Sequence, residues 1–434
     1  MRVFYGWWVV LAAFLNLFFS VGILYYGFPV FYPSMVDSLG FTRSQLTQGF
    51  LIGFVVAALL FGILAGVLID RWGARRVIRI GIWFVGLSLI LMGSMTRLWQ
   101  YYVLCVTEVV GYVLTGPIPN QVLISNWFQV RRGRAMGYAY LGLGLGGAIS
   151  PLLINALIQN FGWRHAFQII GILILVVLFP VAQWVTRSNP RDLNLFPDGL
   201  VGAALSLPAN EPSATAGTGP IPIQGVELAR AVRTRNFWLI LGACTLTIGA
   251  IGAVTQHLIL FLKDHGYSQS AASRVSSALL VSSLAGRVIV GYFADRFSAK
   301  NMMALFYLAL GLAIPLMLLA NRPAAIWGFA VAFGFAMGAD YMLIPLVTAE
   351  CFGLATLGKL LSLIIMGYSL GQWFAPWLAG RIFDTYHSYD LAWGMMAIAA
   401  TIGAGMIYAV VPNRRVPGSS SEIPPKEFKH VRSE

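Results

Sequence analysis

Long apolar runs, each of about 20 residues or more, recur along the whole chain and leave little choice of fold. The core of a bilayer holds no water, so backbone amides must be satisfied within the segment, and runs of this length cross as α-helices. By apolar length and breaker residues, the runs fall at about 7–32, 45–69, 77–96, 99–124, 134–158 and 165–186, then at 236–262, 271–294, 301–320, 324–349, 358–383 and 390–411. The sequence therefore predicts an all-α membrane protein with twelve transmembrane helices in two six-helix bundles.

The composition agrees with a lipid environment. Hydrophobic residues make up 58% of the 434 positions and charged residues only 10%, whereas a water-soluble domain uses about a quarter of its residues for charge. The formal net charge of +13 is spread in small groups between apolar runs, which argues against a nucleic-acid surface. Cys105, Cys244 and Cys351 each stand alone in apolar stretches, so we expect packing residues, no metal site and no cofactor.

Two polar stretches set the domain boundaries. Residues 187–235 contain six prolines among Ser, Thr, Gly and Ala, a composition typical of a loose linker. We assign residues 1–186 to an N-terminal bundle, 187–235 to a cytoplasmic linker, 236–411 to a C-terminal bundle and 412–434 to a disordered cytoplasmic tail. The apolar run after Gly6 is too long for a signal peptide and lacks a small-residue cleavage site, so we expect the first helix to be retained.

Lysine and arginine predict the orientation of the helices. With a cytoplasmic amino terminus, 21 of the 29 basic residues fall on the cytoplasmic side and 7 on the opposite side, while Arg287 lies inside a span. Because basic loops tend to stay in the cytoplasm during insertion, this excess predicts that both termini and the linker are cytoplasmic. We expect a multi-pass protein of the plasma (inner) membrane.

A polar motif follows the second span of each half, which supports an internal repeat. The first copy comprises Gly66, Asp70, Arg71, Gly73, Arg75 and Arg76, and the second comprises Gly291, Asp295 and Arg296. The first copy, GVLIDRWGARR, resembles the cytoplasmic signature of the major facilitator superfamily, and the resemblance implies the major facilitator fold. Asp70 at a helix end can pair with a neighbouring arginine as a cytoplasmic gate that breaks when the halves rock. A basic loop that only sets topology is the alternative.

Three further segments resemble the monocarboxylate porters and the neighbouring oxalate and formate antiporters of that superfamily. Residues 5–10, YGWWVV, are similar to the start of their first helix, and residues 127–137 are similar to their WFxxRRGxAxG stretch. Arg287 matches the arginine with which those families hold a substrate carboxylate. Tyr26 stands in the region where animal porters carry a lysine, and Ser283 stands where they carry an acid, so this sequence departs from the family pattern at two positions that bear on coupling.

Arg287 is the strongest functional signal in the sequence. A charge near the bilayer midplane costs about 2.5 to 3.5 kcal/mol on insertion scales unless it meets a partner or a wet cavity. A guanidinium stays charged and its planar fork matches a carboxylate, so a small organic acid is its natural ligand. Asp340, at a similar depth in another span, is the alternative partner, and the two contacts can alternate.

Two intramembrane acids are candidates for proton coupling. Asp340 can release a proton when Arg287 is unpaired and take one up when the substrate leaves, although a permanent counter-ion is an equal alternative. Glu108 is either a second proton site or a polar contact between helices.

Four further residues complete the predicted substrate site. Resemblance to bacterial monocarboxylate porters implies a binding role for His257, which can also change charge near neutral pH, and a packed histidine is the alternative. Asn120 follows Pro117 and Pro119, which bend the span and free its carbonyls. Tyr26 lies in the first span at the position noted above, and Tyr341 lies directly beside Asp340.

These residues predict a secondary transporter that moves a small monocarboxylate, such as lactate or pyruvate, together with a proton by alternating access. An organic anion or dicarboxylate exchanger is the first alternative, and a membrane sensor without transport is the second. An enzyme is not expected, because no nucleophile with a base and no pair of close acids is visible in the sequence. We expect a monomer whose partners are the lipid bilayer, protons and the organic anion.

Overall fold

All regular structure in the described chain is helical, as predicted. The computed structural model describes residues 4–61, 68–69, 71–128, 131–199, 228–293, 297–353 and 357–411. The 412–434 tail and most of the 187–235 linker therefore lie outside the described residues.

The N-terminal group of helices starts with one continuous rod. It consists of α1 (Gly6–Leu17), the π-helical segment η1 (Phe18–Gly27), the 3-10 segment η2 (Phe28–Phe31) and α2 (Tyr32–Leu39). The group continues with α3 (Arg43–Phe61), α5 (Ala74–Met92), α6 (Leu98–Thr115), α7 (Pro117–Trp127), α8 (Arg132–Pro180) and the π-helical η3 (Val181–Val185). Short 3-10 turns follow at η4 (Pro190–Leu193) and η5 (Pro197–Gly199).

Glycine and proline break two of these rods. Extended backbone at Gly116, directly before Pro117, separates α6 from α7. Within α8, Gly162 has a φ of 78° and a ψ of 159°, which a residue with a side chain rarely adopts, so α8 consists of two helical stretches. The predicted spans at 134–158 and 165–186 lie on either side of this break.

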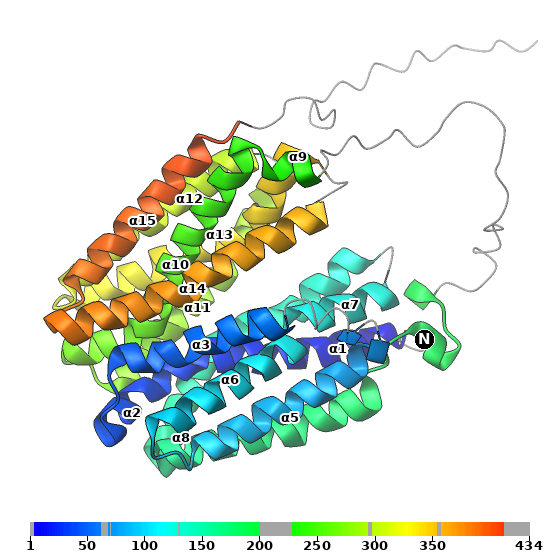
Figure 1. The fold of residues 1–434 in the computed structure, drawn as a ribbon, viewed down its shortest axis with the longest axis horizontal. Coiled ribbons are helices and arrows are strands. Elements are labelled where there is room, and N and C mark those ends of the chain that lie inside the picture. The colour runs from blue at the N-terminus through cyan, green and yellow to red at the C-terminus, as the bar shows by residue number, and fades with distance from the viewer. Residues whose placement is uncertain are drawn as a thin grey trace, which may run out of the picture.

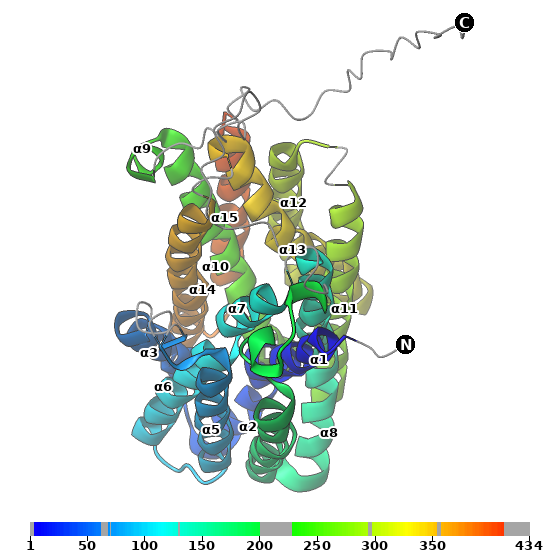
Figure 2. The same ribbon diagram turned by 90° about the vertical axis from the view of Figure 1, so that its right-hand side faces the viewer.

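The C-terminal group follows a short helix, α9 (Leu228–Val232). Its members are α10 (Arg235–Asp264), α11 (Gln269–Phe293), α12 (Ala299–Ala313) with the 3-10 extension η7 (Ile314–Leu319), α13 (Pro323–Phe352), α14 (Leu357–Tyr386) and α15 (Asp390–Tyr408). Figures 1 and 2 show this group beside the N-terminal group, with all long helices running in roughly one direction.

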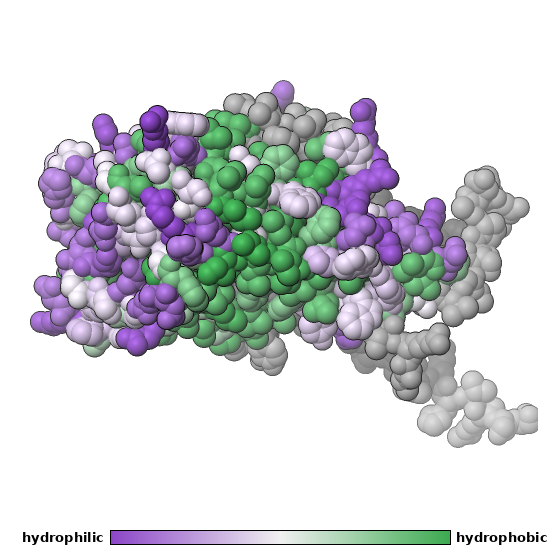
Figure 3. Space-filling view, turned by 90° about the horizontal axis from the view of Figure 1, so that it is seen from below, coloured by the Kyte–Doolittle hydropathy of each residue, from purple (hydrophilic) through white to green (hydrophobic). Residues whose placement is uncertain are grey.

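The surface is that of a membrane protein. Within the described residues, eight helical stretches are long and apolar enough to cross a bilayer, among them Gly6–Leu39, Gly133–Val185 and Arg235–Asp264. Figure 3 shows a band of hydrophobic side chains between two hydrophilic ends. Large apolar side chains such as Val288 and Leu312 are exposed, which suits contact with lipid rather than water.

The two groups touch at one end and separate toward the other (Figure 1). We call the end that holds Arg43 and Asp264 the closed end, and the end that holds Phe4 and Val411, the first and last described residues, the terminal end. At the closed end α3 packs on α14, and α8 packs on α11. The Ser277 hydroxyl donates to the Ala148 carbonyl over 2.5 Å, and Gln159 donates to the Ser270 hydroxyl over 2.7 Å.

Among the described residues, contacts between the groups extend from the closed end to about the middle of the helices. Gly144 and Gly147 of α8 lie against Leu284 and Leu280 of α11, whereas Gly137, nearer the terminal end, has open space around it. Met366 and Leu370, on the terminal side of Trp373 in α14, are likewise exposed. The described helices therefore enclose the midplane from the closed end and leave it less covered toward the terminal end.

Glycines allow α11 and α13 to cross almost backbone to backbone. A Cβ atom on Gly338 would lie 2.0 Å from the Ser283 carbonyl oxygen, and one on Gly334 would lie 2.1 Å from the Leu279 carbonyl oxygen. Gly286 of α11 meets the Phe335 carbonyl in the same way. Small residues at membrane helix crossings let van der Waals contact replace the missing hydrophobic driving force, and this crossing sets the spacing between Arg287 and Asp340.

We predict that Gly338→Ala destabilises the purified protein. The added methyl group must push α11 and α13 apart, and overpacking of this kind costs about 1 to 3 kcal/mol of unfolding free energy. Thermal unfolding in detergent should show a lower midpoint for Gly338→Ala. The matched control is Gly328→Ala in the same helix, where a Cβ atom meets nothing within 4 Å. Equal midpoints for the two variants would show that the crossing does not depend on Gly338.

Candidate functional site

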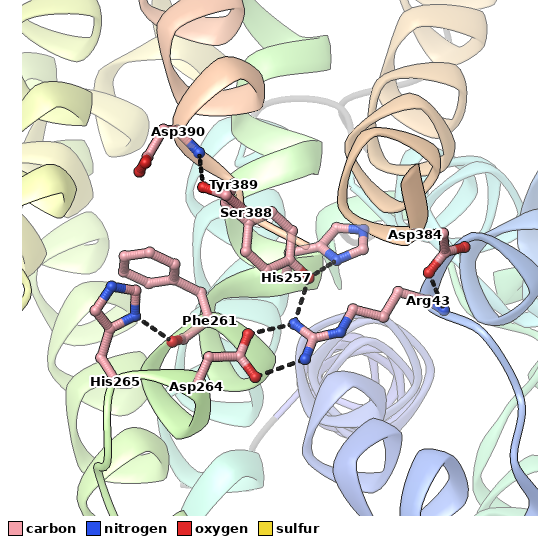
Figure 4. A network of polar contacts seen from close by, with 9 residues as sticks. All are labelled: Arg43, His257, Phe261, Asp264, His265, Asp384, Ser388, Tyr389 and Asp390. Atoms are coloured by element: carbon pink, nitrogen blue, oxygen red, sulfur yellow. Dashed lines mark hydrogen bonds and ion pairs between the residues drawn. The ribbon is translucent and has the colours of Figure 1, made fainter. Parts of the chain in front are cut away.

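An arginine clamps the two helix groups together at the closed end (Figure 4). Arg43 begins α3, and its guanidinium donates two hydrogen bonds to the carboxylate of Asp264, the last residue of α10, over 2.5 and 2.6 Å. The Arg43 side chain is only 11% exposed and also lies 3.6 Å from the ring centre of Phe383. Such a forked, partly desolvated pair is among the stronger polar contacts in proteins.

Asp384 of α14 also binds α3, at the backbone of its first residues. Its carboxylate accepts hydrogen bonds from the backbone N–H groups of Arg43 and Ser44, over 3.1 and 3.0 Å. These N–H groups start α3 and have no partner within the helix, and the positive end of a helix favours an acid there. Neither Asp264 nor Asp384 stood out in the sequence, because each is a single acid near a loop.

His257 belongs to this closed-end network. The Arg43 guanidinium donates to the Tyr389 hydroxyl over 2.9 Å, and that hydroxyl lies 2.8 Å from Nδ1 of His257. Nε2 of His257 lies 2.8 Å from the Pro376 carbonyl oxygen, which can only accept. Nε2 therefore carries the hydrogen, and the Tyr389 hydroxyl donates to Nδ1. The histidine is fully buried, with both ring nitrogens bound to protein.

The midplane holds the predicted pair of Arg287 and Asp340. Arg287 in α11 is partly buried and interacts electrostatically with Asp340 in α13. Asp340 is 4% exposed, and the buried Tyr307 hydroxyl of α12 donates to its carboxylate over 2.6 Å. Sequence reasoning placed Arg287 near Asp340 from their depth, but it missed Tyr307, which is one tyrosine among 17.

Tyrosines from both helix groups surround the midplane near this pair. Tyr25 and Tyr26 stand on the π-helical η1, with ring centres 4.7 Å apart. Tyr112, Tyr140 and Tyr368 come from α6, α8 and α14, and Tyr112 is close enough to interact electrostatically with the other four. Tyr368 interacts in the same way with Asp340. Only the fold shows that these hydroxyls share one region, because their sequence spacing has no pattern.

Polar contacts join η1 to the C-terminal group. Gln372 donates to the Tyr25 hydroxyl over 2.8 Å, and Gln256 donates to the Tyr25 carbonyl over 3.3 Å. Tyr32 donates to the Gln256 side chain over 2.9 Å. A π-helical turn often marks a functional site, and here it lies where the two groups meet.

Glu108 faces a small cavity on the closed-end side of the tyrosines. The cavity is lined by Leu24, Tyr25, Phe50, Phe54, Glu108, Val109, Tyr112 and Trp373. Glu108 is 1% exposed, and neither carboxyl oxygen has a hydrogen-bond partner in the described structure. The acid that was predicted as a proton site or a helix contact therefore makes no polar contact between the described helices.

The Asn120 side chain bonds to the backbone at the break between α6 and α7. Its side-chain amide donates to the Thr115 and Gly116 carbonyls, over 2.7 Å each, and its oxygen lies 3.5 Å from the amide of Asn16. Pro119 has no N–H to donate to the Thr115 carbonyl, so the Asn120 side chain supplies that missing donor. Contact with a substrate stays a prediction for Asn120, as it does for His257.

The predicted gate motif is described only in part. Gly66, Asp70, Asp295, Arg296 and the side chain of Tyr341 lie outside the described residues, and Gly291 lies within α11. Arg71 is exposed, and Gly73 has a φ of 77° before α5 begins. Arg75 donates to the Ala182 and Gln183 carbonyls in η3, so it ties α5 to η3, while Arg76 is also exposed.

Comparison with known proteins identifies relatives along the whole chain. A family model described as the Major Facilitator Superfamily matches residues 10–286 and 261–433. Monocarboxylate transporter 13 of Bos taurus is 25% identical over 407 residues, which cover 93% of this chain and 88% of the relative. The MFS transporter asaE of Aspergillus flavus is 26% identical over 351 residues, 78% of this chain and 72% of the relative. The structure of a mutant of the nucleoside transporter NupG has a TM-score of 0.71 at 14% identity, covering 94% of this chain and 100% of that one, a likeness of fold alone.

We predict that Asp264→Asn loosens the closed end. The change leaves the Arg43 guanidinium without its forked carboxylate, so α3 and α10 should separate more often. The measurement is the labelling rate of a cysteine placed at Thr47, a buried position one turn into α3, by a membrane-impermeant maleimide. We expect labelling to be severalfold faster in Asp264→Asn.

Lys263→Asn is the matched control for this experiment. It breaks a second ion pair between the groups, in which the Lys263 ammonium lies 3.1 Å from the Asp37 carboxylate. Because Lys263 and Asp37 are 32% and 67% exposed, that pair should contribute little. Equal labelling in both variants would contradict a specific role for Arg43 and Asp264.

Proposed function

This chain belongs to the major facilitator superfamily, and from that premise we propose that it is a proton-coupled symporter of a small monocarboxylate, such as lactate or pyruvate. Membership confirms the resemblance seen in GVLIDRWGARR, and the relatives named monocarboxylate transporters support the predicted branch. Both the family and these relatives identify a transporter rather than an enzyme. The substrate and the coupling ion are our inference from the residues at the midplane.

The observation that carries the proposal is Arg287 at the midplane. Its guanidinium cannot lose its charge, lies in the half of α11 nearer the terminal end, and interacts with the acid Asp340. A carboxylate substrate would compete with Asp340 for this cation. Binding would then displace one negative partner with another, so the cation stays satisfied through the cycle.

The tyrosines around this pair suit a small acid. Hydroxyl groups of Tyr26, Tyr140 and Tyr368 can donate to a carboxylate or a 2-oxo group while their rings exclude water. We propose Arg287, Tyr26 and Tyr341 as direct contacts. We propose that His257 and Asn120 act on the substrate indirectly. In this structure His257 bonds to the closed-end network, and Asn120 bonds to the backbone at the break between α6 and α7.

Alternating access would follow from rocking of the two helix groups. We propose twelve membrane spans in two bundles, residues 1–186 and 236–411, joined by a cytoplasmic linker. The excess of basic residues at the terminal end supports a cytoplasmic terminal end. The closed end would then face outward, and the arrangement described here would be the inward-facing state.

Opening of the closed end requires loss of the contacts of Arg43 and Asp384. Gate contacts at the terminal end would form in the opposite state, through the motif that includes Asp70, Arg71, Asp295 and Arg296. The coupled proton would bind at an intramembrane acid, Asp340 or Glu108. We propose a monomer in the plasma (inner) membrane as the working unit.

We predict that the purified protein in proteoliposomes takes up radiolabelled lactate or pyruvate faster with an inward proton gradient. Dissipating the gradient with an uncoupler should remove the stimulation. Uptake that ignores the gradient but requires substrate inside the vesicle would favour an anion exchanger instead. Binding of an acid without flux would favour a sensor.

Arg287→Ala should abolish this uptake while leaving membrane insertion normal. The reason is that the substrate carboxylate loses its proposed cation, worth about 2 to 5 kcal/mol when a buried charged partner is removed. Arg274→Ala is the matched control, since Arg274 lies on the same helix but is exposed near the closed end. Normal transport by Arg287→Ala would remove Arg287 from the site.

A further inference from the structure

Glu108 is placed where an ionised carboxylate is unstable. Its side chain is 1% exposed, and both carboxyl oxygens are without a hydrogen-bond donor in the described structure. An ionised carboxylate there would lose its hydration without gaining a hydrogen bond or a cation. A neutral carboxyl group loses much less hydration free energy on burial. The geometry therefore favours the protonated acid in this state of the protein.

The groups that face Glu108 do not offset this effect. The titratable ones are Tyr25 from η1, Tyr32 from α2, and Tyr101, Cys105 and Tyr112 from α6 itself. The packed neighbours contribute only uncharged side chains here, namely Phe50 and Phe54 from α3 and Trp373 from α14. On α5, Gly81 and Val85 lie against Gly111 of α6, about one turn beyond Glu108. Tyrosine and cysteine are neutral at ordinary pH, so among these described neighbours no cation stabilises an anionic Glu108.

Asp340 is surrounded differently, although it is buried as well. The Tyr307 hydroxyl donates to its carboxylate over 2.6 Å, and Arg287 acts on it electrostatically. A donor and a nearby cation both favour the ionised form of an acid. The two intramembrane acids therefore have different surroundings, one suited to hold a negative charge and the other suited to hold a proton.

Trp373 covers the cavity at Glu108 from the opposite helix group. Its ring stacks on Phe54 and Phe50 of α3, with ring centres 4.4 and 5.4 Å apart. The cavity has room for about one water molecule, so a proton or a water fits but an organic ligand does not. Because Trp373 belongs to α14 and Phe50 belongs to α3, separation of these helices at the closed end would uncover Glu108.

We propose that Glu108 carries the coupled proton, that Asp340 stays ionised and serves as the counter-ion of Arg287 whenever no substrate is bound, and that Trp373 controls access to Glu108 from the closed end. This assignment rests on the proposed symport and selects between its two candidate acids. With the closed end open, water delivers a proton and an O–H bond forms on the Glu108 carboxyl. Closure seals it beneath Trp373. The proton then passes to a water molecule on the terminal side, reached past Tyr25 and Tyr112, which line both the cavity and the tyrosine region. The O–H bond breaks and the carboxylate stays behind, so one proton is taken up and one is delivered.

The test uses the full chain in proteoliposomes, with lactate or pyruvate as the probe. Glu108→Gln keeps the shape of the protonated acid but cannot release a proton. A gradient of one pH unit supports about tenfold accumulation by a one-proton symporter, and we expect Glu108→Gln to lose that accumulation. Exchange of labelled for unlabelled acid should continue and should no longer vary with pH. A pH-sensitive dye inside the vesicles should show substrate-driven proton entry for the unaltered protein and none for the variant.

Asp340→Asn should behave differently from Glu108→Gln. It removes the counter-ion of Arg287, so we expect loss of exchange and accumulation together. Gradient-driven accumulation by Glu108→Gln that equals that of the unaltered protein overturns the proposal. Loss of coupling only in Asp340→Asn, with exchange retained, also overturns it and assigns the proton to Asp340.

Two further measurements keep the assignment testable if transport is absent or the variant does not insert. Infrared spectroscopy of the purified protein should show a neutral carboxyl band near neutral pH that is missing in Glu108→Gln, and absence of that band in the unaltered protein refutes the proposal whatever the substrate is. Trp373→Ala should raise proton leak across vesicles, while Trp377→Ala, one turn along α14 and half-buried, should not. Equal leak in these two variants rules out Trp373 as the cover.

Discussion

A polar group that enters the bilayer has to find its partner inside the protein, and this constraint organises the whole molecule. The backbone meets it by forming helices. At the break between α6 and α7, the Asn120 side chain donates to the carbonyls of Thr115 and Gly116, and it supplies the donor that Pro119 cannot give to Thr115. Charged side chains meet the constraint by collecting at two levels, the closed end and the midplane. The charged cluster at the closed end also holds the two helix groups together.

The charged contacts at the closed end differ in kind from those in the middle of the helices. At the closed end, Arg43 has Asp264, Tyr389 and a ring contact with Phe383, and Asp384 binds the start of the same helix. These partners all belong to the protein, so the contacts can hold the two helix groups together without a ligand. At the midplane, Arg287 and Asp340 lie among tyrosines between two close-packed helices, α11 and α13. A cation and an acid in that setting are suited to a partner that enters and leaves.

The sequence predicted the helical character, the approximate positions of most helices and an interaction between Arg287 and Asp340. It could do so because apolar length and spacing along a helix are local properties. It did not predict that His257 would lie beside Tyr389 and close to Arg43, because both are distant from it in the chain. It also missed Tyr307, Tyr140 and Trp373, since single aromatic residues in an apolar helix give no signal until their neighbours are known.

The sequence by itself determined that the helices lie in lipid and that the chain carries the superfamily motif. Apolar runs of this length cannot remain in water, and GVLIDRWGARR identified the superfamily that the comparisons then confirmed. Only the tertiary structure decided which polar residues face one another, and it separated Asp340, which has a hydroxyl donor and a cation, from Glu108, which has aromatic rings and no donor among the described residues. The physical reason is that the state of a buried acid depends on atoms supplied by other helices, and the order of residues along one helix does not contain that information.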